Sequence, residues 1–152
     1  MAAVSEAGTR HRRWLYWLPA LAVMVLIFVL SSQSGLRVSE NAAVEKPLRV
    51  TGHLLAFGTL SGLLLVALSW GRPPRLRDAA MALGITLVYG LTDELHQSFV
   101  PDRTGRLDDV VTDTIGALAG LAVAYLALTL LGSRNASGSR RSPASEDHRS
   151  DG

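Results

Sequence analysis

The sequence predicts an all-α polytopic membrane protein with four transmembrane helices and cytoplasmic N- and C-termini. Three observations predict it. Hydrophobic residues make up 48% of the 152-residue chain and gather in four runs rich in Leu, Ala and Val. Polar or Pro/Gly-containing segments separate these runs. Basic residues are unequally divided between alternate connecting segments. A helix needs about 20 residues to cross a hydrocarbon core of about 30 Å, which each run reaches once its flanking residues are included.

The first run, residues 14–30, follows a short segment that ends in three arginines and a histidine. It opens with Trp14, Tyr16 and Trp17, the placement typical of an interfacial aromatic belt. A cleaved signal peptide is the alternative, because a basic segment before an apolar run is its signature. The run is long for a signal peptide, and residues 31–34 (Ser-Ser-Gln-Ser) offer no clear Ala-x-Ala cleavage site. We therefore expect an uncleaved span.

A polar loop is expected over residues 31–51, followed by a second run from Leu54 to Trp70 that His53 precedes. The Gly-Arg-Pro-Pro-Arg sequence at residues 71–75 then breaks the chain, because proline cannot continue a helix. A third run, residues 79–91, leads directly into the Asp-Glu-Leu-His-Gln segment at residues 93–97.

Residues 100–105 read as a tight turn before the last run, Val110 to Leu131. This run contains Asp113 and a Gly-x-x-x-Gly pair, Gly116 and Gly120. Small residues at this spacing permit close helix packing, and we expect them to pack the fourth helix against its neighbours within the protein.

Three regions follow from these boundaries. Residues 1–13 form a basic cytoplasmic N-terminus, residues 14–131 the four-helix membrane domain, and residues 132–152 a disordered cytoplasmic tail rich in Ser, Arg and Gly. The orientation rests on the basic residues: ten lie on the side of the termini and the 72–77 loop, and five lie on the other side. The excess marks the cytoplasmic side.

Composition excludes several classes of function. The chain has no cysteine, which rules out disulfides, thiolate metal sites and cysteine nucleophiles. Its arginines sit in short clusters that flank the apolar runs and do not alternate with aromatic residues, so nucleic acid is not an expected partner. The expected partner is the lipid bilayer of a bacterial plasma membrane. Nothing in the sequence indicates an oligomeric state.

The predicted topology brings polar residues from four segments to one membrane face. Ionisable side chains are costly at membrane depth, so such a cluster is a candidate functional site. In a helix, Asp93 would share a face with Gln97 and His96, whereas Glu94 would point about 100° away. Ser32 and Gln33 end the first span at this level. The candidate binding residues are His53, Asp93, Glu94, His96, Gln97, Arg103, Asp109 and Asp113.

A purely structural interpretation competes with this one. Spans end in polar residues, so Asp102, Arg106 and Asp108 fit a hydrated helix end, with Asp108 as a helix cap. Asp113 lies inside the last span and needs a partner, for which Arg103 and His53 are the obvious donors. An ion pair of this kind would hold the third and fourth helices together.

Two ligand classes fit the cluster. Asp93, His96 and Asp109 are candidate ligands of a divalent metal, with Asp113 and His53 available to complete the shell. No established zinc signature such as His-Glu-x-x-His is present. Alternatively, Arg103 and the histidines bind an anionic lipid head group while the carboxylates contact hydroxyls or amines.

The polar segment also resembles a known family. The pattern Tyr89-x-x-x-Asp-Glu-x-His-Gln-x-Phe-x-Pro-x-Arg103, followed by Asp109-x-x-x-Asp113-x-x-Gly-x-x-x-Gly120, resembles the VanZ-like family of small bacterial membrane proteins over residues 14–131. Ser32, Ser34 and His53 fit the same pattern. The chain departs from it at Asp102, where glycine is common, and at Asp113, where asparagine is common. The resemblance implies an integral membrane protein and, through the family's namesake, a link to low-level resistance to the glycopeptide teicoplanin.

Three functional hypotheses follow. The first is a VanZ-like envelope protein whose extracytoplasmic polar pocket binds a head group or glycopeptide-like ligand. The second is a membrane enzyme acting on lipid or cell-wall intermediates, with His96 or Glu94 as general base and metal assistance. The third is an accessory subunit whose charged cluster is structural. Transport is less favoured, because four spans are few and no pair of broken helices is evident.

Overall fold

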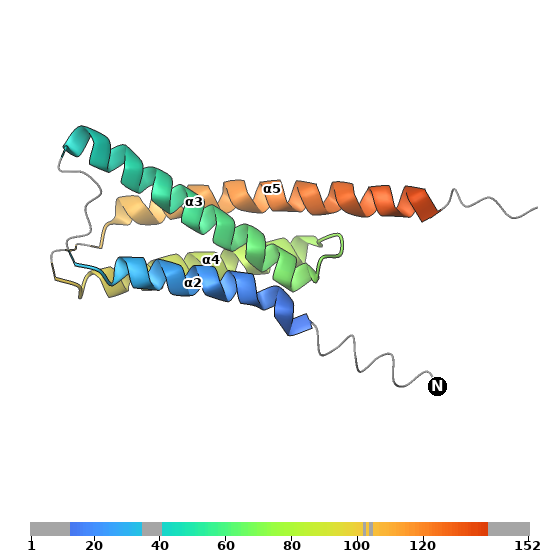
Figure 1. Cartoon of the computed structure of the whole chain (residues 1–152), viewed down its shortest axis with the longest axis horizontal. Helices are drawn as coiled ribbons and strands as arrows, with labels where there is room; N and C mark the ends of the chain where they lie inside the picture. Colours follow the sequence, from blue (N-terminus) through green and yellow to red (C-terminus); the bar gives the residue numbers. More distant parts are fainter. Residues whose placement is uncertain (1–12, 35–40, 102, 104, 140–152) are drawn as a thin grey trace, which may run out of the picture.

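The computed structural model describes residues 13–34, 41–101, 103 and 105–139. Every regular element in these ranges is helical. A short 3₁₀ turn, η1 (Arg13–Trp17), leads into four α-helices: α2 (Leu18–Ser31), α3 (Ala42–Ser69), α4 (Leu76–Gln97) and α5 (Leu107–Ser139). The helices run up and down alternately, so the start of η1 and the end of α5 lie at the same end of the bundle (Figure 1). The all-helical prediction is confirmed.

Three segments are long and apolar enough to cross a membrane: Arg13–Ser31, Ala43–Ser69 and Leu107–Ser133. Only 17%, 33% and 11% of their most apolar windows is buried inside the protein, so most of this apolar surface faces outward, where lipid would satisfy it. The chain is therefore a helical membrane protein. The remaining helix, α4, has 22 residues but is less apolar, because Asp78 lies in its first turn and Asp93 and Glu94 lie near its end.

The predicted loop over residues 31–51 is wrong in its second half, because α3 already begins at Ala42. Asn41 caps the helix by accepting a hydrogen bond from the backbone N–H of Ala43 (3.0 Å). Glu45 in the first turn further stabilises the start through the helix dipole. Pro47 lies inside the helix, where it removes one backbone hydrogen bond close to the start.

The other helix boundaries differ less from the predicted ones. The third helix includes the whole Asp-Glu-Leu-His-Gln segment and ends at Gln97. The last helix continues beyond residue 131 to Ser139, into the region where we expected the tail to begin. The rest of the predicted tail, residues 140–152, and the predicted departure at Asp102 lie outside the described residues.

The apolar core centres on α3, which crosses the bundle between α2 and α5 (Figure 1). Phe57, Leu60, Leu64 and Leu65 of this helix are almost completely buried. They pack with Ala20 and Ile27 of α2 and Ala82 of α4. The helix that carries His53 therefore touches all three others, which places its first turns against the polar ends of α4 and α5.

Helices α3 and α5 cross in backbone contact. A Cβ added at Gly58 would meet the carbonyl oxygen of Gly116 at 2.9 Å, and one added at Gly120 would collide with the backbone of Gly58. Gly62 also faces Gly120. The prediction that Gly116 and Gly120 pack the last helix within the protein is confirmed. Its counterpart, Gly58-x-x-x-Gly62 on α3, had not been singled out in the sequence.

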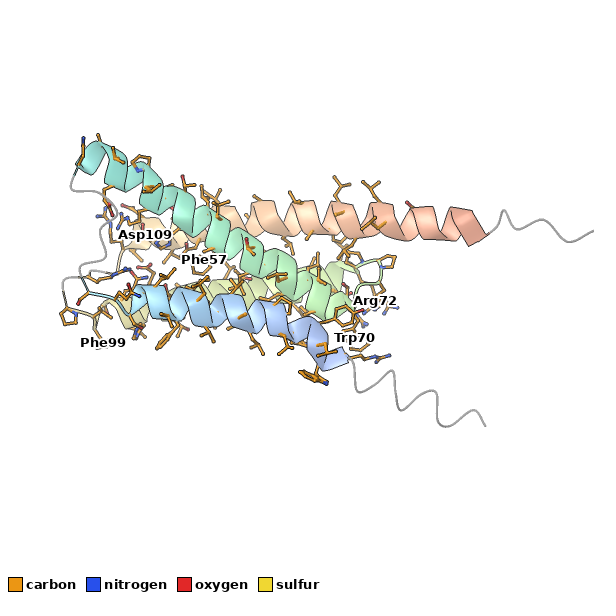
Figure 2. The ribbon with its side chains drawn as sticks, viewed as in Figure 1. Phe57, Trp70, Arg72, Phe99 and Asp109 are labelled. Atoms are coloured by element: carbon orange, nitrogen blue, oxygen red, sulfur yellow. The ribbon has the colours of Figure 1, made fainter. Side chains whose placement is uncertain are left out.

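The turn between α3 and α4 forms an arginine–tryptophan end, which we define by Arg13, Trp70, Arg72 and Asp78. Trp70 ends α3 in a left-handed conformation (φ 51°), and the Arg13 guanidinium lies 4.0 Å from the centre of its ring. The buried carboxylate of Asp78 accepts a hydrogen bond from the Arg75 backbone N–H and pairs with Arg72 at 3.4 Å. Trp70 and Arg72 lie at the opposite end of the bundle from Asp109 and Phe99 (Figure 2).

Candidate functional site

The other end of the bundle carries a polar cluster, as the sequence predicts. The end of α2, the first half of α3, the end of α4 and the start of α5 all deliver side chains to it. Most of these polar side chains are buried inside the bundle. We define the polar cluster as Ser31, His53, Asp93, Glu94, Gln97, Asp109 and Asp113.

One half of the polar cluster ties α4 to α2. The carboxylate of Asp93 accepts hydrogen bonds from the Ser31 hydroxyl (2.6 Å) and from the Gln97 side-chain amide (2.8 Å). The predicted i, i+4 pairing of Asp93 and Gln97 is thus confirmed. Both oxygens of Asp93 have a donor, so this carboxylate is satisfied within the fold.

His96 also faces α2, one turn further along α4. Its Nε2 lies 3.0 Å from the Ser32 hydroxyl, and its ring stacks on Phe28 with a centroid separation of 4.7 Å. The ring is only partly buried. His96 therefore lies at the border between the polar cluster and the outer surface of the bundle.

Arg103 does not pair with Asp113. Its guanidinium donates to the carbonyl oxygens of Leu30 and Gln33, at 3.1 and 3.2 Å, and to the side-chain oxygen of Gln97 at 3.3 Å. The last carbonyls of a helix lack intrahelical partners, so the end of α2 attracts this side chain. Three of its five N–H donors are engaged in this way. The donor to Asp113 is His53, the other partner that the sequence offered.

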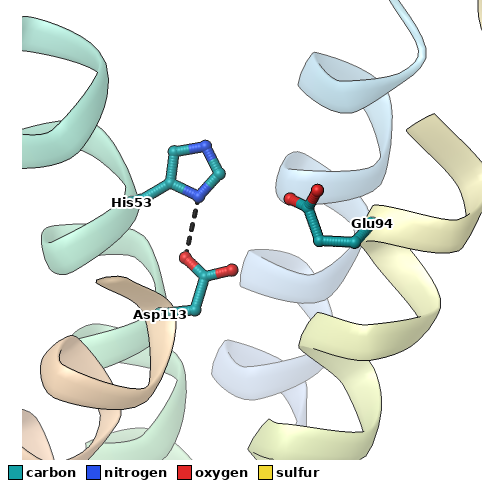
Figure 3. Close-up of side chains that lie close together, drawn as sticks. All are labelled: His53, Glu94 and Asp113. Carbon is teal, nitrogen blue, oxygen red and sulfur yellow. Dashed lines mark hydrogen bonds and ion pairs between the residues drawn. The ribbon is translucent and has the colours of Figure 1, made fainter. Parts of the chain in front are cut away.

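The other half of the polar cluster lies between α3, α4 and α5. His53 Nδ1 is 2.7 Å from one oxygen of Asp113, and the ring and the carboxylate are 16% and 4% exposed. Glu94 approaches from α4, where one of its oxygens accepts the backbone N–H of Arg106 at 2.6 Å. Figure 3 shows the three side chains converging from three different helices.

Two carboxylate oxygens in this half have no hydrogen-bond partner among the described residues: Oε1 of Glu94 and Oδ2 of Asp113. Glu94 is 7% exposed and Asp113 is 3% exposed. In Figure 3 the second oxygen of Asp113 points away from His53, toward the side from which Glu94 approaches. A buried acceptor without a donor costs about 1–3 kcal/mol, so these two oxygens lower the stability of the described fold unless a ligand supplies the donor.

Asp109 pairs with Arg49, at 3.3 Å. Arg49 and His53 lie four residues apart on α3, and they face Asp109 and Asp113, four residues apart on α5. Sequence reasoning missed Arg49, because its segment was expected to be a loop. Its i, i+4 spacing from His53 was the signal that would have found it. Asp108, by contrast, is 85% exposed and pairs with Arg106 (3.4 Å), which fits the hydrated helix end. It is not the helix cap that the sequence suggested, because α5 already begins at Leu107.

The predicted metal ligands Asp93, His96 and Asp109 do not face one another. Asp93 bonds to Ser31 and Gln97, His96 bonds to Ser32, and Asp109 pairs with Arg49. Among the described residues, the set whose ligand atoms lie together is instead His53, Glu94 and Asp113, within 4.8 Å of one another. The reason is the angle between successive side chains around the axis of α4. Adjacent helix residues point about 100° apart, so Glu94 faces α5 while Asp93 faces α2.

A small cavity adjoins one of these residues, and a separate groove runs along α4. A cavity of about 10 Å³, enough for about one water molecule, lies against Asp113, Phe57 and Gly90. An open groove of about 370 Å³ runs along α4 past Gly84, Val88 and Thr92, with Met24 of α2 on its other side. Its lining is mainly apolar. Thr92 precedes His96 by one helical turn, so the groove leads toward the border of the polar cluster.

Comparison with known proteins identifies a family. No curated protein and no solved structure shows a significant match to this chain. A family model, VanZ/LLP1, matches residues 16–128, which include every residue of the polar cluster, the whole of α2, α3 and α4, and α5 as far as residue 128. The chain belongs to the VanZ/LLP1 family of membrane proteins.

Proposed function

We propose that α4 also crosses the membrane, so that the chain has four spans in a bacterial plasma membrane, with both termini cytoplasmic. At 1.5 Å per residue, the 22 residues of α4 extend about 33 Å, enough for a hydrocarbon core. The start of η1 and the end of α5 lie at one end of the bundle, as an even number of spans requires (Figure 1). The excess of basic residues at that end supports its cytoplasmic placement.

The cysteine-free sequence allows a direct test. Single cysteines at Ser98 and Leu76, both exposed and at opposite ends of α4, would be probed with a membrane-impermeant maleimide. We expect Ser98→Cys to react in intact cells and Leu76→Cys to react only after permeabilisation. Reaction of both positions in intact cells would contradict the four-span topology.

We further propose that the polar cluster is an extracytoplasmic site that binds a head group or a glycopeptide-like ligand, in line with the family's link to teicoplanin resistance. The two unpartnered oxygens of Glu94 and Asp113 carry this proposal. Carboxylate oxygens left free in a buried site favour an occupant that is positively charged or donates hydrogen bonds. Ionisable groups of this kind inside a membrane domain are a functional site by default.

The site residues divide into two roles in this proposal. Asp93, Gln97 and Arg103 bond to one another and to α2, so they position the end of α4. His53, Glu94 and Asp113 form the chemical centre, with Asp109 held beside them by Arg49. His96 lies one helical turn beyond Thr92, which lines the apolar groove, a suitable position for the head group of a ligand whose lipid chain follows α4.

Teicoplanin susceptibility of cells that express the chain tests this function. Glu94→Gln should remove the protective effect while leaving the amount of membrane-inserted protein unchanged. Asp108→Asn is the matched control, because Asp108 is an exposed acid at the same end of the bundle. A purely structural cluster predicts the opposite pattern, with less protein in the membrane and a proportionate loss of protection. Equal protection by wild type and all variants would refute the binding role.

A membrane enzyme acting on lipid or cell-wall intermediates is the second candidate, and Glu94 favours it. Its free oxygen lies beside a His–Asp pair, the arrangement that positions a general base. Under this hypothesis, membranes from expressing cells should contain a chemically altered lipid or cell-wall precursor that is absent with Glu94→Gln. Ligand binding without reaction predicts identical precursor profiles.

A further inference from the structure

We propose that His53, Glu94 and Asp113 bind one divalent transition-metal ion at the junction of α3, α4 and α5. Each residue offers one ligand atom, and these atoms lie within 4.8 Å of one another. The three side chains come from three helices and point into one space (Figure 3). A metal at their centre would replace the direct contact between His53 and Asp113 as the link between these helices.

Charge balance supports a bound cation. Among the described residues, the polar cluster holds four buried carboxylates: Asp93, Glu94, Asp109 and Asp113. Asp109 forms an ion pair with Arg49. Asp93 accepts hydrogen bonds from two neutral donors, Ser31 and Gln97, and the side-chain oxygen of Gln97 accepts in turn from Arg103. Among the described residues, Asp113 has only the imidazole of His53 within hydrogen-bonding distance, and Glu94 has only the neutral backbone N–H of Arg106. Buried charges are normally paired or coordinate a metal, and a divalent ion would balance both carboxylates.

The unpartnered oxygens give the second, independent indication. Oε1 of Glu94 and Oδ2 of Asp113 are buried and lack a donor in the described part of the chain. Each carboxylate already uses its other oxygen, Glu94 for the Arg106 backbone and Asp113 for His53. Each carboxylate therefore has one oxygen available to an ion even before the contact between His53 and Asp113 is replaced. Ligands bonded to zinc at about 2.0–2.2 Å lie about 3–3.5 Å apart, so closing the site requires a movement of about 1 Å.

The donor set narrows the kind of metal. Magnesium and calcium prefer shells made only of oxygen, whereas one imidazole with two carboxylates suits zinc or manganese. Three protein ligands leave a coordination position for water or substrate, as in catalytic zinc sites. The cavity of about 10 Å³ against Asp113 is large enough for about one water molecule.

This inference rests on the proposed function only in treating the polar cluster as a binding site. Metal binding is measured on purified protein, whereas the proposed function is measured in cells, so either can fail alone. His96→Gln separates the two. It should change the cellular phenotype and leave the metal affinity unchanged, because His96 bonds to Ser32 and lies outside the metal site.

The test is titration of the purified, chelator-treated full chain in detergent with Zn²⁺ by isothermal calorimetry. We expect one Zn²⁺ per chain, with binding weakened about 100-fold or more in His53→Gln and Glu94→Gln, since even residues that only support metal ligands contribute about 10–100-fold. His96→Gln and Asp108→Asn should bind as wild type does. Unchanged affinity in His53→Gln, or no stoichiometric binding by wild type, would overturn the proposal.

A measurement on wild type alone guards against variants that fail to fold. X-ray absorption of the Zn²⁺-loaded chain should show a shell of nitrogen and oxygen atoms containing one imidazole. Mn²⁺ should compete for the same site, and Mg²⁺ should not. A shell made only of oxygen, or one with two imidazoles, would rule out His53, Glu94 and Asp113 as the ligand set.

Discussion

The two ends of the bundle both bury acidic side chains, but only one end supplies partners to all of their oxygens. At the arginine–tryptophan end, Asp78 is 5% exposed and its carboxylate meets the Arg75 backbone N–H, Arg72 and Arg77. At the other end, Glu94 and Asp113 are as deeply buried, yet each keeps an oxygen without a donor among the described residues. Burial alone therefore does not distinguish a structural carboxylate from one available for a ligand.

What makes that distinction is whether every oxygen of the carboxylate has a hydrogen-bond donor or a cationic partner. Asp78 has its donors on neighbouring residues of the same turn, so its position is fixed by local sequence. Glu94 and Asp113 meet only because three helices converge, and their remaining oxygens share one space. A fully satisfied acid stabilises its turn. An incompletely satisfied pair lowers stability, and such a cost is retained where the site has another use.

The largest expected effect tests the crossing that holds both ends in place. Gly120→Ala would place a Cβ against the backbone of Gly58, which cannot rotate away. We expect a loss of about 3 kcal/mol or more in the free energy of unfolding, because α3 and α5 must separate. Thermal unfolding in detergent, followed by circular dichroism, measures it. Gly84→Ala is the control: a Cβ there meets nothing within 4 Å. Equal stability of the two variants would mean that the glycine crossing does not fix the bundle.

The next effect concerns the satisfied end. Asp78→Asn removes the charge that Arg72 and Arg77 face and weakens the acceptor for the Arg75 backbone. We expect a loss of about 2 kcal/mol, the range for hydrogen bonds to a charged group. The same thermal unfolding assay applies. A variant as stable as wild type would show that the arginine–tryptophan end does not depend on this carboxylate.

The same change of an acid to its amide should act in the opposite direction at the polar cluster. Glu94→Gln keeps an acceptor for the Arg106 backbone and adds a donor that can reach Asp113. In chelator-treated protein we expect a gain of about 1 kcal/mol, because a buried acceptor acquires a partner. Added Zn²⁺ should then raise the unfolding temperature of wild type and not that of the variant. Destabilisation by Glu94→Gln in the metal-free protein would remove the contrast between the two ends.

The smallest expected effect concerns the contact between Arg13 and the Trp70 ring, tested apart from the ion pairs at the same end. Arg13→Ala removes the guanidinium that lies 4.0 Å from the centre of the Trp70 ring. A partly exposed cation–π contact contributes about 0.5–1 kcal/mol, so we expect a loss in this range. Tryptophan emission should shift as well, and metal affinity at the distant end should stay the same. A change in metal affinity would show that the two ends are coupled.

Local periodicity predicted much of this arrangement. The i, i+4 relation placed Asp93 beside Gln97, and the 100° step separated Glu94 from Asp93. The Gly-x-x-x-Gly pair correctly predicted a close internal crossing. What the sequence left open depends on contacts between distant segments. The partner of Asp113 was undecided between Arg103 and His53, because only the folded bundle shows that the end of α2 engages Arg103. Arg49 was missed because Pro47 suggested a loop where Asn41 starts a helix.

The contacts of α2 have a consequence for how the chain is assembled. Apolar packing gives little drive for helix association within lipid, so polar contacts matter more there. The hydrogen bonds that tie α2 to Asp93, His96, Tyr89 and Arg103 join residues 62 to 73 positions apart in the chain. The first span therefore enters the bilayer well before most of its partners are synthesised. We expect a chain truncated after residue 75 to leave Ser31→Cys, at the end of α2, accessible to labelling, and the full chain to protect it, because Ser31 is buried there. The segment that identifies the family would then also be the signal that completes the bundle during synthesis.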